Sequence, residues 1–276
     1  AIAAFERVAY DYPEDTVADR AAEAGYASVL AFREYSQTWE SEPVSERMAY
    51  QELQQLNRLR FANAFPGDAR APAVYYIALQ REFDLNNWEE TVNMAARLVT
   101  WQPTPPDELT TEALLLSGHS LSELARYAEA EQAYRDALAT MAEDDERRSG
   151  VRENLAAAVY RQAEQLADAG NVEAAVSEFL RVGTAVPESA LRANAEYDAA
   201  SLLITANLWE QAIGVLTSFR RSFPNHELID TVPAKLALAY RETEQWERAA
   251  DELQQMVSLA RTPEERRENL LIAAEL

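Results

Sequence analysis

Residues 114–138 read LLLSGHSLSELARYAEAEQAYRDAL, and this stretch decides the fold. It consists of two segments rich in Ala and Leu, joined by a short polar turn near Tyr127. Gly118 in the first segment has no side chain, so a second helix can approach it closely. Ala130 and Tyr134 lie four residues apart, on one face of the second segment. The stretch therefore predicts two helices that pack closely against each other.

The same features recur along the chain with a fixed period. The small residue of the second segment returns every 37 residues, at Ala175, Ala212 and Ala249. Closing prolines follow the same interval, since Pro66 and Pro103 are 37 residues apart, as are Pro187 and Pro224. Two independent markers with one period predict an array of helix pairs, each buried against its neighbours.

Composition agrees with a helical class. The chain has 276 residues, of which 48% are hydrophobic, and only 7 are Gly and 11 are Pro. Such a chain can bury a sizeable core, and its many Ala, Leu, Glu, Gln and Arg residues favour helix over the turn-rich sequence of an all-β fold. No run of 18 apolar residues occurs, so no membrane-spanning helix is expected.

The charge balance excludes one class of partner. The 47 acidic residues outnumber the 25 basic ones, which gives a formal net charge of −22. Phosphate backbones bind clustered Lys and Arg, so nucleic acid is not expected as a partner. Spread acidic charge is most often a solvated surface, and where it does face a partner it favours a neutral or basic one.

The repeated pattern resembles the tetratricopeptide repeat family. That pattern has a small-residue pair, an aromatic at the turn, Ala-x-x-x-aromatic and a closing Pro. Residues 236–256, LALAYRETEQWERAADELQQM, match it nearly as well as residues 114–138. Departures are the 37-residue period in place of about 34, an interval of 45 from Ala130 to Ala175, and Thr91 and Ala95 in place of Ala and an aromatic. The resemblance implies an all-α fold, a right-handed superhelical solenoid of antiparallel helix pairs.

In this frame the whole of 1–276 is expected to form a single solenoid. A lone helix at 1–12, closed by Pro13, precedes the pairs and a terminal helix at 264–276 follows them, so we expect the chain to be a segment of a longer array. Gly150 is expected to end a helix. Asp107 or Thr110 is expected to cap the helix that follows the prolines at 103–106. Pro43 is expected in the first turn of another helix, with Ser41 as its cap. The pairs are expected at about 16–66, 72–103, 109–142, 152–187, 191–224 and 230–262.

A search for chemistry yields no catalytic or metal-binding motif. His119 and His226 are far apart, and neither has a carboxylate at metal-binding spacing. The acidic run 143–146 lacks the pattern of a calcium loop. No Gly-rich phosphate loop, nucleophile elbow or Cys is present. We therefore expect no enzyme activity, no metal and no cofactor in this chain.

The family pattern places certain first-helix positions on a concave, partner-binding face. Three Tyr recur at one equivalent position, and Tyr combines an apolar ring with a hydrogen-bonding hydroxyl. Two readings stay open, recognition of a partner or packing between neighbouring repeats. A clamp of Lys, Arg and Asn for a terminal carboxylate is absent, whereas Glu164, Asp168 and Asp198 favour a neutral or basic segment. The candidate site residues are Tyr76, Gln80, His119, Tyr160, Glu164, Tyr197, Ser201 and Leu238.

A narrower resemblance concerns location. FERVAYDYPEDTVADRAAEAGY at 5–26 and LTSFRRSFPNHELIDTVPAKLALAY at 216–240 resemble the repeat junctions of bacterial envelope tetratricopeptide proteins. This implies a periplasmic protein, membrane-anchored through a part outside this chain, with the cytoplasm as the alternative. The implied function is a non-catalytic scaffold that binds a protein or peptide. The alternative is a substrate-positioning or regulatory arm of a larger envelope enzyme.

Overall fold

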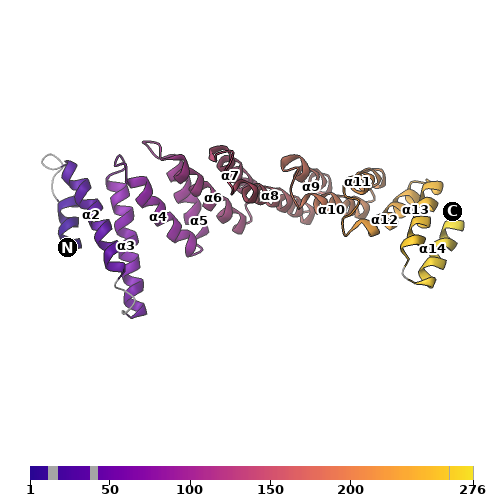
Figure 1. Cartoon of the computed structure of the whole chain (residues 1–276), viewed down its shortest axis with the longest axis horizontal. Coiled ribbons are helices and arrows are strands. Elements are labelled where there is room, and N and C mark those ends of the chain that lie inside the picture. The colour runs from indigo at the N-terminus through magenta and orange to yellow at the C-terminus, as the bar shows by residue number, and fades with distance from the viewer. Residues whose placement is uncertain (12–17, 38–42, 261, 276) are drawn as a thin grey trace. The chain divides into compact units, whose positions relative to one another are not determined.

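The computed structural model describes residues 1–11, 18–37, 43–260 and 262–275, and all the regular structure in these ranges is helical. The all-α class is therefore confirmed. Figure 1 labels most of the helices along the chain. The chain forms two compact units, Ala1–Asp145 (unit 1) and Glu146–Leu276 (unit 2), and each is described by itself. The expectation of a single solenoid over 1–276 stays a prediction.

Unit 1 begins with α1, which packs against the first helix of the following pair, and then continues as three pairs of helices. Its helices are α1 (Ile2–Tyr10), α2 (Ala18–Ser36), α3 (Val44–Ala64), α4 (Ala71–Asp84), α5 (Trp88–Val99), α6 (Asp107–Glu123) and α7 (Tyr127–Thr140).

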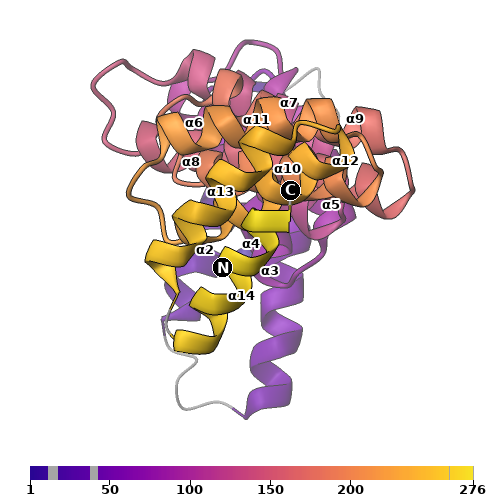
Figure 2. The ribbon, with the colours of Figure 1, turned by 90° about the vertical axis from the view of Figure 1, so that its right-hand side faces the viewer.

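Unit 2 contains three further pairs and a last helix, α14, that lies beside α13, as both views show (Figures 1 and 2). Its elements are α8 (Arg148–Asp168), α9 (Val172–Ala185), α10 (Arg192–Thr205), α11 (Trp209–Ser222), the short 3-10 helix η3 (Ile229–Thr231), α12 (Val232–Glu242), α13 (Trp246–Leu259) and α14 (Pro263–Glu275).

Five of the pairs turn in the same way. Two residues after the end of the first helix stands a residue with positive φ, and the residue after that one donates its N–H to a carbonyl five positions back, as Arg126 does to Leu121 at 2.8 Å. This is the Schellman closure of a helix C-terminus. The second helix begins within two residues of it. The positive-φ residues are Asn86, Ala125, Gly170, Asn207 and Glu244.

In each of these five pairs, two residues 16 positions apart occupy equivalent positions on the facing helices. In α6 and α7, a Cβ on Gly118 would lie 2.7 Å from the ring of Tyr134, so only Gly fits there without a shift. The three pairs of unit 2 repeat the arrangement, with a buried small residue on the first helix and a larger buried residue on the second. The pairs are Gly118 with Tyr134, Ala163 with Phe179, Ala200 with Leu216, and Ala237 with Leu253.

The α4–α5 pair reverses these sizes. Leu79 occupies the small position of the first helix, and Ala95 occupies the large position of the second. Both are buried in one apolar cluster with Tyr75 and Leu98. The larger first-helix residue fills the space that the missing aromatic would occupy, so the sequence departure at Ala95 is compatible with a close-packed core.

Three local expectations were wrong. Gly150 does not break a helix, because it is the third residue of α8, where the backbone N–H lacks a helical partner in any case. Neither Asp107 nor Thr110 caps α6, which begins at Asp107 after Pro106 without a side-chain cap. Pro43 precedes the first turn of α3 at the N-cap position. Pro13 and Ser41 lie outside the described residues.

Candidate partner-binding faces

The candidate residues of unit 2 lie on its three first helices, α8, α10 and α12. Tyr160, Glu164, Tyr197 and Ser201 are partly buried, and Leu238 is 39% exposed. Equivalent positions of consecutive pairs therefore contribute to one face of this unit, which we call the first-helix face. It comprises Tyr160, Glu164, Tyr197, Asp198, Ser201, Lys235 and Leu238.

Tyr160 links α8 to α10. Its hydroxyl donates a short hydrogen bond to the carboxylate of Asp198, and its ring meets Phe179 edge-on at 5.2 Å between centroids. Burial, followed by the hydrogen bond to Asp198, raises the pKa of Tyr160 well above its usual value. The hydroxyl therefore stays protonated and remains a donor to Asp198 throughout the physiological range.

Tyr197 links α10 to the start of α12. Its hydroxyl lies 2.7 Å from Oγ1 of Thr231, and Nζ of Lys235 lies 5.0 Å from the ring centroid. Lys235 also donates to Oγ of Ser201 at 3.2 Å. The only Lys of the chain is thus held by an aromatic face and a hydroxyl from the preceding first helix.

These contacts bear on the two readings of the Tyr residues. The hydroxyls of Tyr160 and Tyr197 are both engaged between neighbouring helix pairs, which is a packing role. Their side chains still form part of the partly exposed surface. The two roles coexist, because hydrogen bonds between pairs fix the positions of rings that remain accessible on one side.

The electrostatics of the first-helix face are more balanced than the sequence suggests. Glu164 accepts a hydrogen bond from Arg161 at 2.7 Å, and Asp198 accepts from Tyr160. Lys235 adds a cation that lies in the same network as Ser201. The sequence placed Asp198 near this face, but it did not predict that Asp198 pairs with Tyr160 or that Lys235 contacts Tyr197 and Ser201, because these partners come from neighbouring helix pairs.

The candidate residues of unit 1 are arranged differently. Gln80 is exposed on α4 and donates to the hydroxyl of Tyr76 at 3.0 Å. His119 lies partly buried on α6, with Nδ1 3.1 Å from the hydroxyl of Tyr134. Burial lowers the pKa of His119, with Glu123 acting in the opposite direction. His119 therefore belongs to the α6–α7 contact more than to an open surface.

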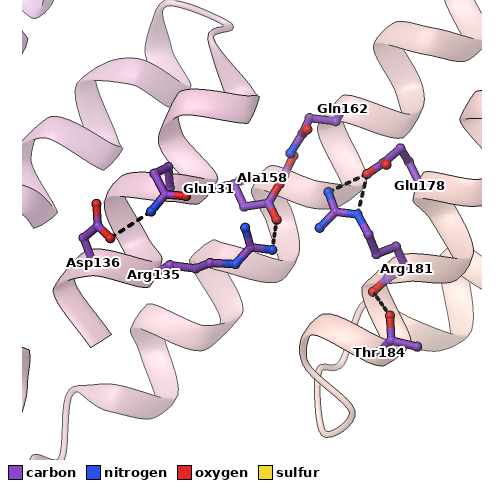
Figure 3. A network of polar contacts seen from close by, with 9 residues as sticks. Glu131, Arg135, Asp136, Ala158, Gln162, Glu178, Arg181 and Thr184 are labelled. Carbon is purple, nitrogen blue, oxygen red and sulfur yellow. Dashed lines mark hydrogen bonds and ion pairs between the residues drawn. The ribbon is translucent and has the colours of Figure 1, made fainter. Parts of the chain in front are cut away.

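The second helices of unit 2 carry polar groups that pair among themselves. On α9, Nε of Arg181 donates to Glu178 at 2.8 Å and its carbonyl accepts from Thr184 at 2.9 Å (Figure 3). On α11, Arg220 donates to both carboxylate oxygens of buried Glu252 on α13, at 2.8 and 2.9 Å. Arg220 thus joins two second helices and is not a free surface residue.

The described residues contain no group of three or more His, Cys, Asp or Glu residues placed to hold a metal ion. None of the helices that the structure describes is both long and apolar enough to cross a membrane.

Solved structures that are similar to this chain include tetratricopeptide repeat proteins. No family model matches it, and no curated protein matches it in sequence. The chain is similar to YrrB, described as a TPR protein with an unusual peptide-binding site, at 15% identity over 78% of this chain and 97% of that one, with a TM-score of 0.36. A tetratricopeptide repeat protein from Parabacteroides merdae is 17% identical over 99% of this chain and 98% of that one, with a TM-score of 0.31. Yeast Tom70 is 14% identical over 96% of this chain and 60% of that one, with a TM-score of 0.34.

Proposed function

We propose that this chain is a non-catalytic scaffold that binds a protein or peptide on the first-helix face of unit 2. The observation that carries the proposal is the set of bonds between consecutive first helices, Tyr160 to Asp198 and Tyr197 to Thr231. They hold partly exposed aromatic rings in fixed positions. A surface fixed before binding loses less side-chain entropy when a partner arrives.

The chemistry of this face suits an extended segment with both apolar and hydrogen-bonding groups. Tyr rings and Leu238 supply apolar area, whereas Ser201, Glu164 and Lys235 supply polar contacts. Because both signs of charge are present, we propose a neutral or weakly basic segment as the partner. The mixed charge also disfavours a strongly charged polymer.

We propose the bacterial periplasm as the location, on the resemblance of the repeat junctions to envelope proteins. Fractionation of the native host with an antibody against this chain tests it. Recovery in the osmotic-shock or membrane fraction is expected, and recovery with cytoplasmic markers contradicts the location without affecting the binding proposal.

Site-specific photo-crosslinking in the native host tests the binding face. A photoreactive phenylalanine analogue replaces Leu238, whose exposed side chain can be exchanged without disturbing the core, and in a second strain Tyr197. The matched control is Thr217, an exposed residue of α11. Arg220 is unsuitable as a control because it holds Glu252.

A discrete adduct at Leu238 and Tyr197, absent at Thr217, is the expected result. Introducing Ser201→Arg should then abolish that adduct, because the added side chain occupies the face without entering the core. Adducts of equal yield at all three positions, or at Thr217 alone, would show that the first-helix face is a packing layer and not a binding surface.

A further inference from the structure

Unit 1 contains an open cleft that none of the candidate site residues lines, which we call the α5–α7 cleft. It has a volume of about 310 Å³ and lies between the second helices α5 and α7, with the first helix α6 contributing its third wall. Its lining includes Val92, Ala96 and Val99 of α5, Leu121 of α6, and Gln132 and Ala133 of α7.

The cleft coincides with the break in the repeat pattern at Ala95. At the equivalent position every other second helix after α5 carries a large residue, namely Tyr134, Phe179, Leu216 or Leu253. Ala96 follows, and Ala133 faces the cleft from α7. Leu79 fills the space of the missing large residue inside the α4–α5 pair, so that space is not the cleft. The cleft is hollow because the small side chains of Ala95, Ala96 and Ala133 line it.

The rim of the cleft is acidic. Two carboxylates line it: Glu129, which is ion-paired with Arg126 outside the lining, and Asp136, which accepts a hydrogen bond from Gln132. The wider segment 88–140 has nine acidic residues and three Arg. Each of these Arg already has a partner: Arg126 pairs with Glu89 and Glu129, Arg135 pairs with Glu131, and Arg97 stacks on Tyr75 and Trp101.

We propose that the α5–α7 cleft seats one apolar side chain of a basic amphipathic segment of a partner protein. The apolar walls remove the anchor side chain from water, and the acidic rim attracts Lys or Arg residues beside that anchor. A single anchor matches the size of the hollow, which is at the lower end of ligand pockets. The cleft and the first-helix face share no residue, so this binding site does not depend on the proposed function.

The test uses the full chain and a fluorescent synthetic peptide that forms a helix with Leu on one face and Lys on the other. Fluorescence anisotropy measures its affinity. Filling the hollow with Ala96→Trp should weaken binding by about tenfold or more, equivalent to roughly 1.4 kcal/mol or more. The matched control is Thr217→Trp at the equivalent position of α11, which should bind as the parent chain does.

A second variant that fills the cleft and a variant that removes a rim charge test the apolar hollow and the acidic rim separately. Gln132 is exposed on the opposite wall, so Gln132→Trp should reproduce the loss without affecting the fold. Asp136→Asn should weaken binding by about two- to fivefold and reduce its dependence on salt. The same peptide with Glu in place of Lys should not bind.

Three results would overturn the proposal. Equal affinity of the Ala96→Trp, Gln132→Trp and Thr217→Trp chains would mean that the peptide binds through overall charge alone. Equal binding of the Glu peptide would remove the role of the rim. Self-association of the parent chain that Ala96→Trp abolishes, measured by analytical ultracentrifugation, would assign the cleft to a second copy of the chain. Melting curves verify that each variant is folded. Photo-crosslinking at Leu238 tests the first-helix face, so its outcome does not bear on the cleft.

Discussion

At the scale of single residues, Gly118 shows how closely the paired helices approach. The ring of Tyr134 occupies the place of a Cβ, whereas a Cβ on Gly214 of α11 would meet no atom within 4 Å. Gly118 lies in a first helix and Gly214 in a second helix, and their surroundings are opposite. The sequence alone singled out Gly118 through its place in the repeat, and nothing in the pattern distinguished Gly214 as open.

We predict that Gly118→Ala destabilises the chain and that Gly214→Ala stabilises it. The first change forces the ring of buried Tyr134 to move, at a cost of about 1–3 kcal/mol. The second removes backbone entropy from the unfolded chain and should add about 0.5–1 kcal/mol. Urea denaturation of both variants checks this. Equal effects would contradict the close contact at Gly118.

A second residue-scale prediction concerns pH. The folded pKa of His119 lies below its unfolded value of about 6.5. The unfolded chain therefore takes up the proton first as the pH falls, so stability is lost from about pH 6.5 downward, until the folded state is protonated too.

Denaturation midpoints at pH 7.5 and 5.0 test this in the parent chain and in His119→Gln. His119→Gln should lose less stability over this interval than the parent chain. Identical slopes in parent and His119→Gln would rule out His119 as a source of the pH dependence.

At the scale of helices and turns, the sequence predicted the pairs better than their connections. Periodic Ala and aromatic residues indicated which segments pair. The left-handed residue of each turn was not identified from the sequence, because the five positive-φ positions share no single residue type. Gly and, to a lesser degree, Asn adopt this conformation readily, whereas tertiary packing holds Ala125 and Glu244 in a conformation that they rarely adopt.

The turn at Ala125 provides a test of this strain. Ala125 has φ of 56°, which costs an Ala residue about 1 kcal/mol relative to Gly. Ala125→Gly should therefore raise stability by up to about 1 kcal/mol, and Gly170→Ala, at the equivalent turn, should lower it by a similar amount. Thermal melts followed by circular dichroism measure both. A loss of stability in Ala125→Gly would contradict the strained turn.

The burial of polar side chains on α3 could not be predicted from the hydrophobic pattern of the sequence. Gln54, Gln55 and Asn57 are buried, whereas Leu53 and Leu56 are exposed, opposite to an ordinary amphipathic helix. Asn57 donates to Glu6 and Ser28, so a hydrogen-bonding network takes the place of apolar packing there. Such a network depends on partners from distant helices, and hydrophobic periodicity does not predict it.

The repeat register predicts the effect of a larger side chain at Ala212. Ala212 is fully buried on α11 at the recurring small position. Ala212→Trp should overpack the helix contact at a cost of about 1–3 kcal/mol. Thr217→Trp, on the exposed side of the same helix, should have little effect. Unchanged melting of the Ala212 variant would show that the register is shifted.

At the scale of the whole molecule, charge is uneven between the two units. Residues 1–145 contain 26 acidic and 11 basic residues, a formal charge of −15, which leaves −7 of the total −22 for residues 146–276. Composition reveals this directly. The sequence does not predict where that charge would meet a partner, because the α5–α7 cleft is formed by small apolar side chains from three helices and not by a motif.

We predict that salt stabilises the chain. Repulsion among unpaired carboxylates opposes the compact state, and ions screen it. Raising NaCl from 20 to 500 mM should increase Tm by about 2–4 °C, equivalent to roughly 1 kcal/mol. Differential scanning calorimetry measures the shift. A lower Tm in salt would mean that the ion pairs between helices outweigh the net repulsion.

The 16-residue spacing of the contacts inside each pair has a further consequence, for the speed of folding. A loop this short closes at little entropic cost, so each helix pair can form before contacts with the rest of the chain exist. Nucleation is then not tied to one region, and growth proceeds from whichever pair forms first. The exchange of sizes between Leu79 and Ala95 stays within one such loop, so the α4–α5 pair can assemble as readily as the pairs that follow the common pattern.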